Sequence, residues 1–239
     1  MLRFLPLCAV MGCTTLSGAR PLAAGQHEVG VVVGGPLLEF GGPLPLPNLV
    51  LAGRSGLPAL ADRPFDLGYG LNATGLPFGI VALHGDLGWQ LNDQNRALPA
   101  FTVRNKVFFA TNVLAPGKVD GAKRGVWAAD EIDVYASWAL GESVVYGSLG
   151  QVFDVGAPRL VLVPGVGTSI DPGAAGGLKL QLEARWWAVN RSSNQNSVNW
   201  IPKNPGAIGI TVGVAYGFGK ESASQLAEGS RSTGTGGAR

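Results

Sequence analysis

The chain has 239 residues, of which 18 are Lys or Arg and 16 are Asp or Glu, and its charged fraction of 14% is well below the roughly 25% of a soluble domain. The formal net charge of +2 and the lack of a basic cluster give no electrostatic case for nucleic-acid binding. The 37 Gly and 16 Pro residues disfavour helices, and past the N-terminal segment no apolar run reaches the roughly 20 residues of a membrane-spanning helix. Two classes fit such a chain: a β-rich soluble domain, or a membrane β-barrel, in which lipid-facing side chains raise the hydrophobicity without forming long runs.

The N-terminal residues have the layout of a secretory signal. Arg3 supplies a positive charge, an apolar run extends from Phe4 to Met11, and the small Gly12 stands just before Cys13. A secretory signal needs this order of charge, apolar region and small-residue cleavage site. The apolar run is too short to cross a bilayer as a helix.

The end of this segment, Val10-Met11-Gly12-Cys13, resembles the lipobox of bacterial lipoproteins. In that family the cysteine is lipidated and becomes the first residue of the mature chain. The resemblance implies a signal peptide over residues 1–12, lipidation at Cys13, a lipidated linker over residues 13–25 and handling by the lipoprotein-sorting machinery. An ordinary signal peptide with an incidental cysteine is the alternative.

Cysteine and histidine usage argues against metal or thiol chemistry. Cys8 would be removed with the signal and Cys13 would carry the lipid, so the mature domain would have no disulfide and no thiol nucleophile. The only histidines are His27 and His84, so a zinc site built from Cys and His ligands is not expected. We therefore expect neither a metal nor a cofactor.

Residues 26–219 divide into segments with strand character, each bounded by Gly, Pro, Asn or Asp. In chain order these ten segments cover residues 26–34, 47–56, 63–73, 78–91, 99–111, 130–140, 142–154, 159–168, 176–190 and 207–219. They predict an all-β fold, an antiparallel up-and-down transmembrane β-barrel of about ten strands, with eight and twelve as bounds because strand limits read from one sequence are imprecise.

Apolar residues alternate with small or polar ones over the length of a membrane strand. From Phe65 to Leu71 every odd residue is apolar, and residues 178–186 and 208–219 repeat the pattern. Successive side chains of a strand point to opposite faces, so each run has one apolar face. The runs are about 9–12 residues long, as tilted membrane strands are, whereas soluble strands are more often about 5–6. The residues predicted to face lipid include Leu67, Leu180 and Val212.

Two further features fit a membrane barrel. Aromatic residues near the strand ends would form interfacial girdles, and they are Phe65, Trp89, Trp138, Trp186 and Phe218. The longest connections, residues 35–46, 112–129 and 191–206, are all odd-numbered in chain order and therefore lie at one end of an up-and-down barrel. With an N-terminus anchored on the periplasmic side, these long loops are predicted to be extracellular.

The last segment, Thr211 to Phe218, resembles the C-terminal β-signal of outer-membrane barrels. It has a polar residue, a Gly, an aromatic residue and a final aromatic residue at the spacing of that signal. The resemblance implies recognition by the barrel-assembly machinery. Residues 220–239 are rich in Gly, Ser and Thr without apolar periodicity and are expected to form a disordered tail.

Several polar residues fall on the faces predicted to point into the barrel, namely His84, Asp86, Arg104, Lys106, Glu131, Asp133, Glu183 and Arg185. We interpret them as an interior polar network, because charges in a narrow barrel must pair. His84 and Asp86 lie two residues apart on one face and could hydrogen-bond. No catalytic residue is assigned. A barrel-embedded hydrolase would use His84 as base with a nearby serine, and Ser137 and Ser148 are the candidates.

The sequence thus predicts a barrel over residues 26–219 in the bacterial outer membrane, lipid-anchored at Cys13, with a non-enzymatic structural or surface-interaction role. A barrel of this size is expected to be filled by side chains. Its expected partners are outer-membrane lipid and the barrel-assembly and lipoprotein-sorting machineries, and its oligomeric state stays open. The alternatives are a hydrolase similar to lipid A deacylases, and a soluble lipocalin-like periplasmic lipoprotein that binds an apolar ligand in an inward-facing apolar cavity.

Overall fold

A computed structural model describes residues 18–38, 46–114, 126–154, 160–171, 177–190 and 207–219. These residues form ten strands and one turn of 3-10 helix: β1 (Gln26–Leu38), β2 (Leu46–Leu60), β3 (Arg63–Asn72), η1 (Leu76–Phe78), β4 (Ile80–Gln90), β5 (Ala100–Asn112), β6 (Val126–Leu140), β7 (Ser143–Asp154), β8 (Val161–Ile170), β9 (Leu178–Trp187) and β10 (Ala207–Gly219).

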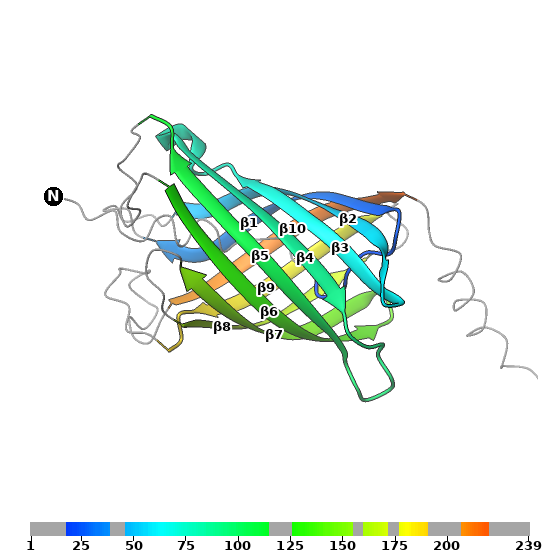
Figure 1. The fold of residues 1–239 in the computed structure, drawn as a ribbon. Coiled ribbons are helices and arrows are strands. Elements are labelled where there is room, and N and C mark those ends of the chain that lie inside the picture. The colour runs from blue at the N-terminus through cyan, green and yellow to red at the C-terminus, as the bar shows by residue number, and fades with distance from the viewer. Residues whose placement is uncertain are drawn as a thin grey trace, which may run out of the picture.

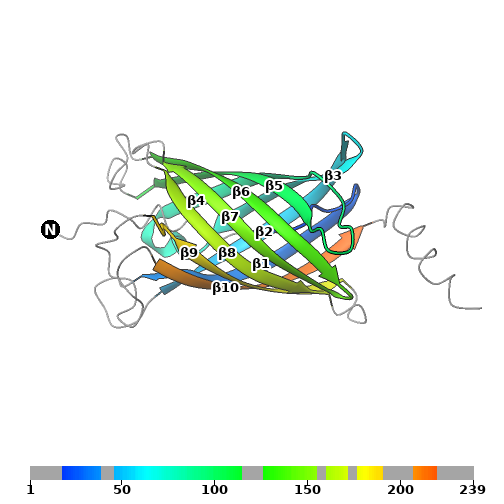
Figure 2. The same ribbon diagram turned by 90° about the horizontal axis from the view of Figure 1, so that it is seen from below.

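Every strand pairs antiparallel with its neighbours in the chain, and β1 pairs with β10, so the sheet closes on itself (Figure 1). The strands wind around the barrel at a tilt (Figure 2), as closure of a sheet requires. The predicted all-β, antiparallel up-and-down barrel of about ten strands is confirmed.

The two ends of the barrel differ in their connections. The strands joined by residues 39–45, 113–125 and 188–206 meet at one end, on the left in Figure 1, which we call the long-loop end. The strands joined by residues 61–62, 91–99, 141–142 and 171–177 meet at the opposite end, which we call the short-turn end. At the short-turn end Ala61 and Asp62 both have positive φ (51° and 59°), as a two-residue hairpin turn requires.

The barrel is apolar on the outside. Leu67, Leu180 and Val212, which the sequence predicts to face lipid, are 38%, 43% and 52% exposed. The exterior of every strand is built from such alternate apolar positions, whereas the alternate polar positions are buried inside. This is the reverse of the arrangement that the soluble lipocalin-like alternative requires, and it is the surface of a membrane barrel.

The aromatic side chains near the strand ends lie at both rims. Trp89 and Trp138, at the short-turn end, donate their indole N–H groups to the carbonyl oxygens of Leu60 (3.1 Å) and Ala97 (3.2 Å). Trp186, at the long-loop end, is 38% exposed. An apolar ring with one satisfied polar group suits the boundary between lipid and water.

Several strands are longer than predicted, and β1 shows why. Its predicted end at Gly34 is wrong, because pairing with β2 continues to Leu38 past a register shift. Gly34 and Gly35 have positive φ (137° and 98°), so these residues form a bulge within the strand rather than a turn after it. The prediction for β6 also began too late, since that strand starts at Val126.

Pro164 lies within β8 without ending it. Pairing between β8 and β7 includes Pro164 opposite Leu149, but pairing between β8 and β9 begins only at Gly165. Pro therefore stands in a part of the strand where one edge has no ladder partner, which is where a residue lacking a backbone N–H is tolerated.

Candidate functional site

The inward positions of β1 to β6 and of β9 carry a set of charged side chains, which we call the ionic layer; all are buried except Lys179, whose side chain is 34% exposed. Its members are Glu28, Arg54, Asp66, Asp86, Arg104, Lys106, Glu131, Asp133, Lys179, Glu183 and Arg185. On β4, β5, β6 and β9 the ionic layer lies nearer the short-turn end than a second set of inward residues, Ala82, Phe108, Trp127 and Trp187.

One part of the ionic layer connects β1 to β5. Arg54 pairs with Glu28 (3.1 Å) and with Asp66, and Arg104 pairs with Asp66 (2.7 Å) and with Asp86. Lys179 of β9 also pairs with Glu28. The side chains of Asp66 and Arg104 are fully buried, so each charge depends on its partners for solvation.

The other part connects β6 with β9 past two intervening strands. Asp133 pairs with both Lys106 and Arg185, and it accepts a hydrogen bond from the Tyr135 hydroxyl (3.1 Å). Arg185 also donates to Glu131 (2.7 Å). Because β7 and β8 stand between β6 and β9, these ion pairs run through the lumen rather than along the wall.

A short hydrogen-bonded chain completes this part of the ionic layer. The Tyr146 hydroxyl donates to Glu183 (2.9 Å) and accepts from the Gln181 amide (2.8 Å). The Arg185 Nε lies 3.5 Å from Glu183. Tyr146 of β7 thereby contributes to a network whose other members lie on other strands.

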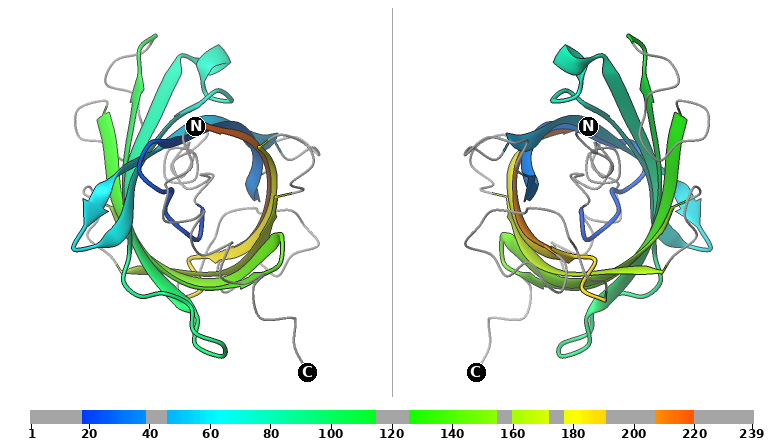
Figure 3. Two further views of the ribbon diagram at one scale, coloured as in Figure 1. Left: turned by 90° about the vertical axis from the view of Figure 1, so that its right-hand side faces the viewer. Right: turned by 90° about the vertical axis from the view of Figure 1, so that its left-hand side faces the viewer.

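Residues 18–25, which precede β1, lie inside the barrel, and we call them the lumen strap (Figure 3). Arg104 Nε donates to the Gly18 carbonyl oxygen (2.9 Å), and Arg54 Nη2 donates to that of Arg20 (2.8 Å). The backbone N–H of Leu22 donates to Asp66 (3.0 Å). The described part of the predicted linker therefore packs against the ionic layer.

Two strap side chains make further contacts with the wall. Arg20 donates to the Ser137 hydroxyl (3.1 Å) and to Gln94, and Ala19 packs against two tyrosine rings, those of Tyr135 and Tyr146. Burial lowers the pKa of the Arg20 guanidinium, while the carboxylate of Asp93 raises it. Arg20 stays charged at neutral pH, because guanidinium groups are not deprotonated in proteins.

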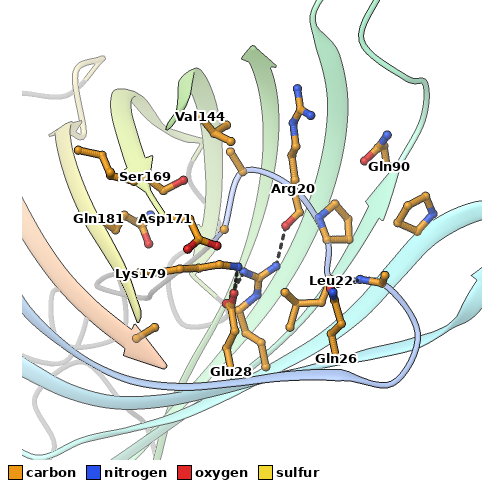
Figure 4. Close-up of a pocket in the computed structure, with 18 of the residues that line it drawn as sticks. Arg20, Leu22, Gln26, Glu28, Gln90, Val144, Ser169, Asp171, Lys179 and Gln181 are labelled. Atoms are coloured by element: carbon orange, nitrogen blue, oxygen red, sulfur yellow. Dashed lines mark hydrogen bonds and ion pairs between the residues drawn. The ribbon is translucent and has the colours of Figure 1, made fainter. Parts of the chain in front are cut away.

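A polar cavity of about 950 Å³ lies beside the lumen strap (Figure 4). The strap forms one wall, and Glu28 and Lys179 of the ionic layer form another part of the lining. Ser169, Asp171 and Gln181 line the side of β8 and β9. The cavity therefore ends at the ionic layer.

The inward residues nearer the long-loop end are apolar, and we call them the apolar layer. It consists of Ala82, Phe108, Ala110, Trp127, Ala129, Val152, Val163 and Trp187, with Val161 packed against it. Arg185 stacks over the Trp187 ring, with its guanidinium carbon 5.2 Å from the ring centroid. This contact joins the ionic and apolar layers.

The structure brings most of the predicted network residues together, and His84 is the exception. Asp86 pairs with Arg104, and within the described residues no hydrogen bond joins it to His84. The His84 ring instead lies 6.1 Å from that of Phe108. Neither serine candidate reaches His84: Ser137 bonds to Arg20 and to the Ala100 carbonyl oxygen, and the buried Ser148 hydroxyl has no hydrogen-bond partner in the described part of the chain.

Four members of the ionic layer, and the lumen strap, were not predicted from the sequence. The four are Glu28, Arg54, Asp66 and Lys179. All four lie on the strand face that points into the lumen, with apolar residues on the other face. The alternation that predicts an inward position for Asp86 therefore predicts one for each of them as well. The strap has no such periodicity, and its position depends on contacts with strands far along the chain.

The remaining observations concern metal binding, membrane-spanning helices and the two ends of the chain. Among the described residues, no group of three or more His, Cys, Asp or Glu side chains is placed to hold a metal ion. In the same part of the chain, no helix is long and apolar enough to span a membrane. Cys13 and residues 220–239 lie outside the described residues, so lipidation and the tail stay predictions.

Comparisons with known proteins find similarity to solved structures and none to protein families or curated sequences. No protein-family model matches the chain, and no curated protein matches it. A porin structure is 12% identical with a TM-score of 0.34, over 86% of this chain and 60% of that one, so this chain spans less than two thirds of the porin's length. The structure of Ail, the attachment invasion locus protein of Yersinia pestis, is 9% identical with a TM-score of 0.22, over 82% of this chain and 99% of that one.

The barrel's own surfaces define its class. An apolar exterior around a lumen that contains buried charges, on a closed antiparallel sheet, makes it a transmembrane β-barrel. Its lumen holds an ionic layer, an apolar layer and a strap.

Proposed function

We propose that this chain is a lipid-anchored β-barrel of the bacterial outer membrane with a structural or surface-interaction role, and that it does not conduct solutes. The observation that carries the proposal is the burial of the ionic layer. Arg104, Lys106, Glu131 and Asp133 are at most 1% exposed, so water does not reach them at the middle of the barrel. Small barrels are filled by their side chains, whereas aqueous channels occur at larger strand numbers.

The cost of burying these charges supports a closed interior. An unpaired ion inside a protein costs several kcal/mol, and here each charge has a partner of opposite sign. An open pore would solvate the same groups with water and would not need the pairs. The two longest connections, residues 113–125 and 188–206, share the long-loop end. Long loops of membrane barrels are extracellular, which favours surface contacts at that end.

Conductance measurement tests this proposal. Purified protein inserted into planar lipid bilayers should give no stepwise current, while a general porin measured under the same conditions should give clear steps. Stable steps from this protein would refute the closed barrel.

Lipidation at Cys13 is tested separately. Cells grown with a palmitate analogue should label the wild type and not Cys13→Ala. The Cys13→Ala variant should still form the barrel, because none of the described contacts involves that residue. Equal labelling of both forms would remove the anchor from the proposal.

The proposed role is non-enzymatic. A hydrolase using His84 needs a serine within hydrogen-bond reach of that base. Of the two candidates, Ser137 bonds elsewhere and Ser148 has no partner in the described part of the chain. Lipid A from cells expressing wild type and His84→Ala should therefore have identical acyl composition by mass spectrometry. Loss of an acyl chain with wild type alone would establish the enzyme.

A further inference from the structure

The lumen strap is held mainly by its backbone. The guanidinium groups of Arg54 and Arg104 donate to strap carbonyl oxygens, and Asp66 accepts from the Leu22 N–H. These three wall residues also belong to the ionic layer. The wall therefore uses its buried charges to bind an irregular chain segment that has no strand partner of its own.

The wall is shaped to let the strap approach closely. A Cβ added to Gly56 on β2 would overlap the carbonyl oxygen and carbon of Ala23 in the strap. The φ of Gly56 is not in the left-handed region, so its backbone conformation does not itself require glycine. Close approach of another backbone is a usual reason for glycine within a strand, and here that backbone is the strap.

The strap lies between buried side chains of the wall and the polar cavity. On one side it covers Asp66 and Arg104, which are fully buried, and Ser137, which is also fully buried. On the other side it forms a wall of the cavity of about 950 Å³. Withdrawal of the strap would join its own space to that cavity and bring water to the ionic layer.

The C-terminal end of the strap is joined to the barrel by few backbone hydrogen bonds. Gly25 donates to the Gly56 carbonyl oxygen (3.3 Å), and Gln26 donates to that of Ala23 (3.0 Å). The wall closes through strand ladders that do not include residues 18–25. A segment that lies outside the ladders can open locally without breaking them, at a free energy below that of global unfolding.

We propose that the lumen strap is an internal plug: it seals the short-turn half of the lumen and can withdraw while the barrel wall stays folded. This inference goes beyond the proposed function and does not depend on lipidation. It assigns residues 18–25 a role distinct from that of a linker.

Thiol accessibility tests the plug in the full-length chain with Cys8→Ser and Cys13→Ser, refolded in detergent. Ser137→Cys places a nearly isosteric thiol under the strap, and its reaction with a charged thiol reagent measures strap opening. Adding Gly56→Ala, which overlaps the strap, should speed labelling about tenfold, equivalent to about 1.4 kcal/mol. The matched control is Gly85→Ala, whose added Cβ comes no closer than 3.9 Å to another group, and it should leave the rate unchanged.

A second reporter separates strap opening from unfolding of the wall. Ala129→Cys lies in the apolar layer and is 1% exposed, so Gly56→Ala should not change its labelling. Equal acceleration at both reporters would overturn the proposal, because the strap would then open only with the whole barrel. Unchanged labelling of Ser137→Cys by Gly56→Ala would overturn it as well.

Deletion of residues 18–24 gives the limiting case. Without the strap, Ser137→Cys should react as fast as Asp93→Cys, a site whose side chain is 71% exposed. A deleted chain that still protects Ser137→Cys would show that the wall alone seals this half. A deleted chain that no longer forms the barrel would show that the strap is not separable.

Discussion

The ionic and apolar layers fill the same lumen by different physical means. In the ionic layer, Asp133 is shared by two cations and a tyrosine hydroxyl, so its place depends on specific partners and angles. In the apolar layer, Phe108 and Trp127 are buried by contact with neighbours that need only fill space. Ion pairs and hydrogen bonds are directional, whereas the hydrophobic effect scales with buried area and is not.

This difference predicts unequal tolerance to substitution. A buried ion that loses its partner remains charged in a poorly solvating interior, and that penalty far exceeds the net gain from the original pair. A buried apolar group that changes shape loses some contacts and leaves a small cavity. Substitutions in the ionic layer should therefore be costly even when volume is kept, and those in the apolar layer should be costly only when volume is lost.

The largest expected effect comes from removing the shared carboxylate. Asp133→Ala leaves Lys106 and Arg185 short of a partner and should lower the free energy of unfolding by about 3–5 kcal/mol. Urea unfolding of the barrel in lipid vesicles, followed by tryptophan fluorescence, measures this change. Glu142→Ala, in an exposed turn, is the control and should change the free energy by less than about 0.5 kcal/mol. A similar small change for Asp133→Ala would mean that the ionic layer is hydrated.

The apolar layer should respond less to a conservative change. Phe108→Leu keeps an apolar side chain at a fully buried position and should cost about 1–2 kcal/mol, from lost contacts and a small cavity. The same urea titration measures it, and Phe109→Leu, on the exposed outer face, is the neighbouring control. If Phe108→Leu cost as much as Asp133→Ala, the two layers would not differ in the way proposed.

Strand identity and the direction of side chains follow well from the sequence, because a strand has a period of two and its apolar face is lipid-facing over many residues. Asp86, Arg104 and Glu183 were placed inside for this reason. Their partners could not be predicted in the same way. Arg185 meets Glu131 and Asp133 across the lumen, and such contacts depend on the stagger with which the sheet closes.

Adjacent aromatic residues mark another limit of the pattern. In Phe108-Phe109 and Trp186-Trp187 both positions are apolar, so only the flanking charged residues Arg104, Lys106 and Arg185 tell the lumen side from the lipid side. The structure places Phe108 and Trp187 inside and leaves Phe109 and Trp186 exposed. The girdle prediction includes Trp186 and not Trp187, whose place on the same inward face as Arg185 follows from the period of two.

The Tyr146 hydroxyl tests whether single hydrogen bonds at the edge of the ionic layer contribute to stability. Tyr146→Phe removes the hydrogen bond to Glu183 and the acceptor used by Gln181 while keeping the ring that packs on Tyr135. A lost buried hydrogen bond costs about 1 kcal/mol, and we expect a decrease of that size in the same titration. Tyr69→Phe, on the exposed outer face, should have no measurable effect. No change at Tyr146 would indicate that water replaces its hydroxyl.

The smallest effect should come from an ion pair outside the lumen. Arg63 pairs with Asp93 at the short-turn end, where their side chains are 34% and 71% exposed. In water the attraction is screened and the ions lose little solvation, so exposed pairs contribute about 0.2–1 kcal/mol, and often nothing measurable. Arg63→Gln should therefore shift the urea midpoint slightly, and 0.5 M salt should abolish the shift by screening. A loss comparable to that of Asp133→Ala would mean that pairing itself, rather than burial of the charges, determines the cost in this barrel.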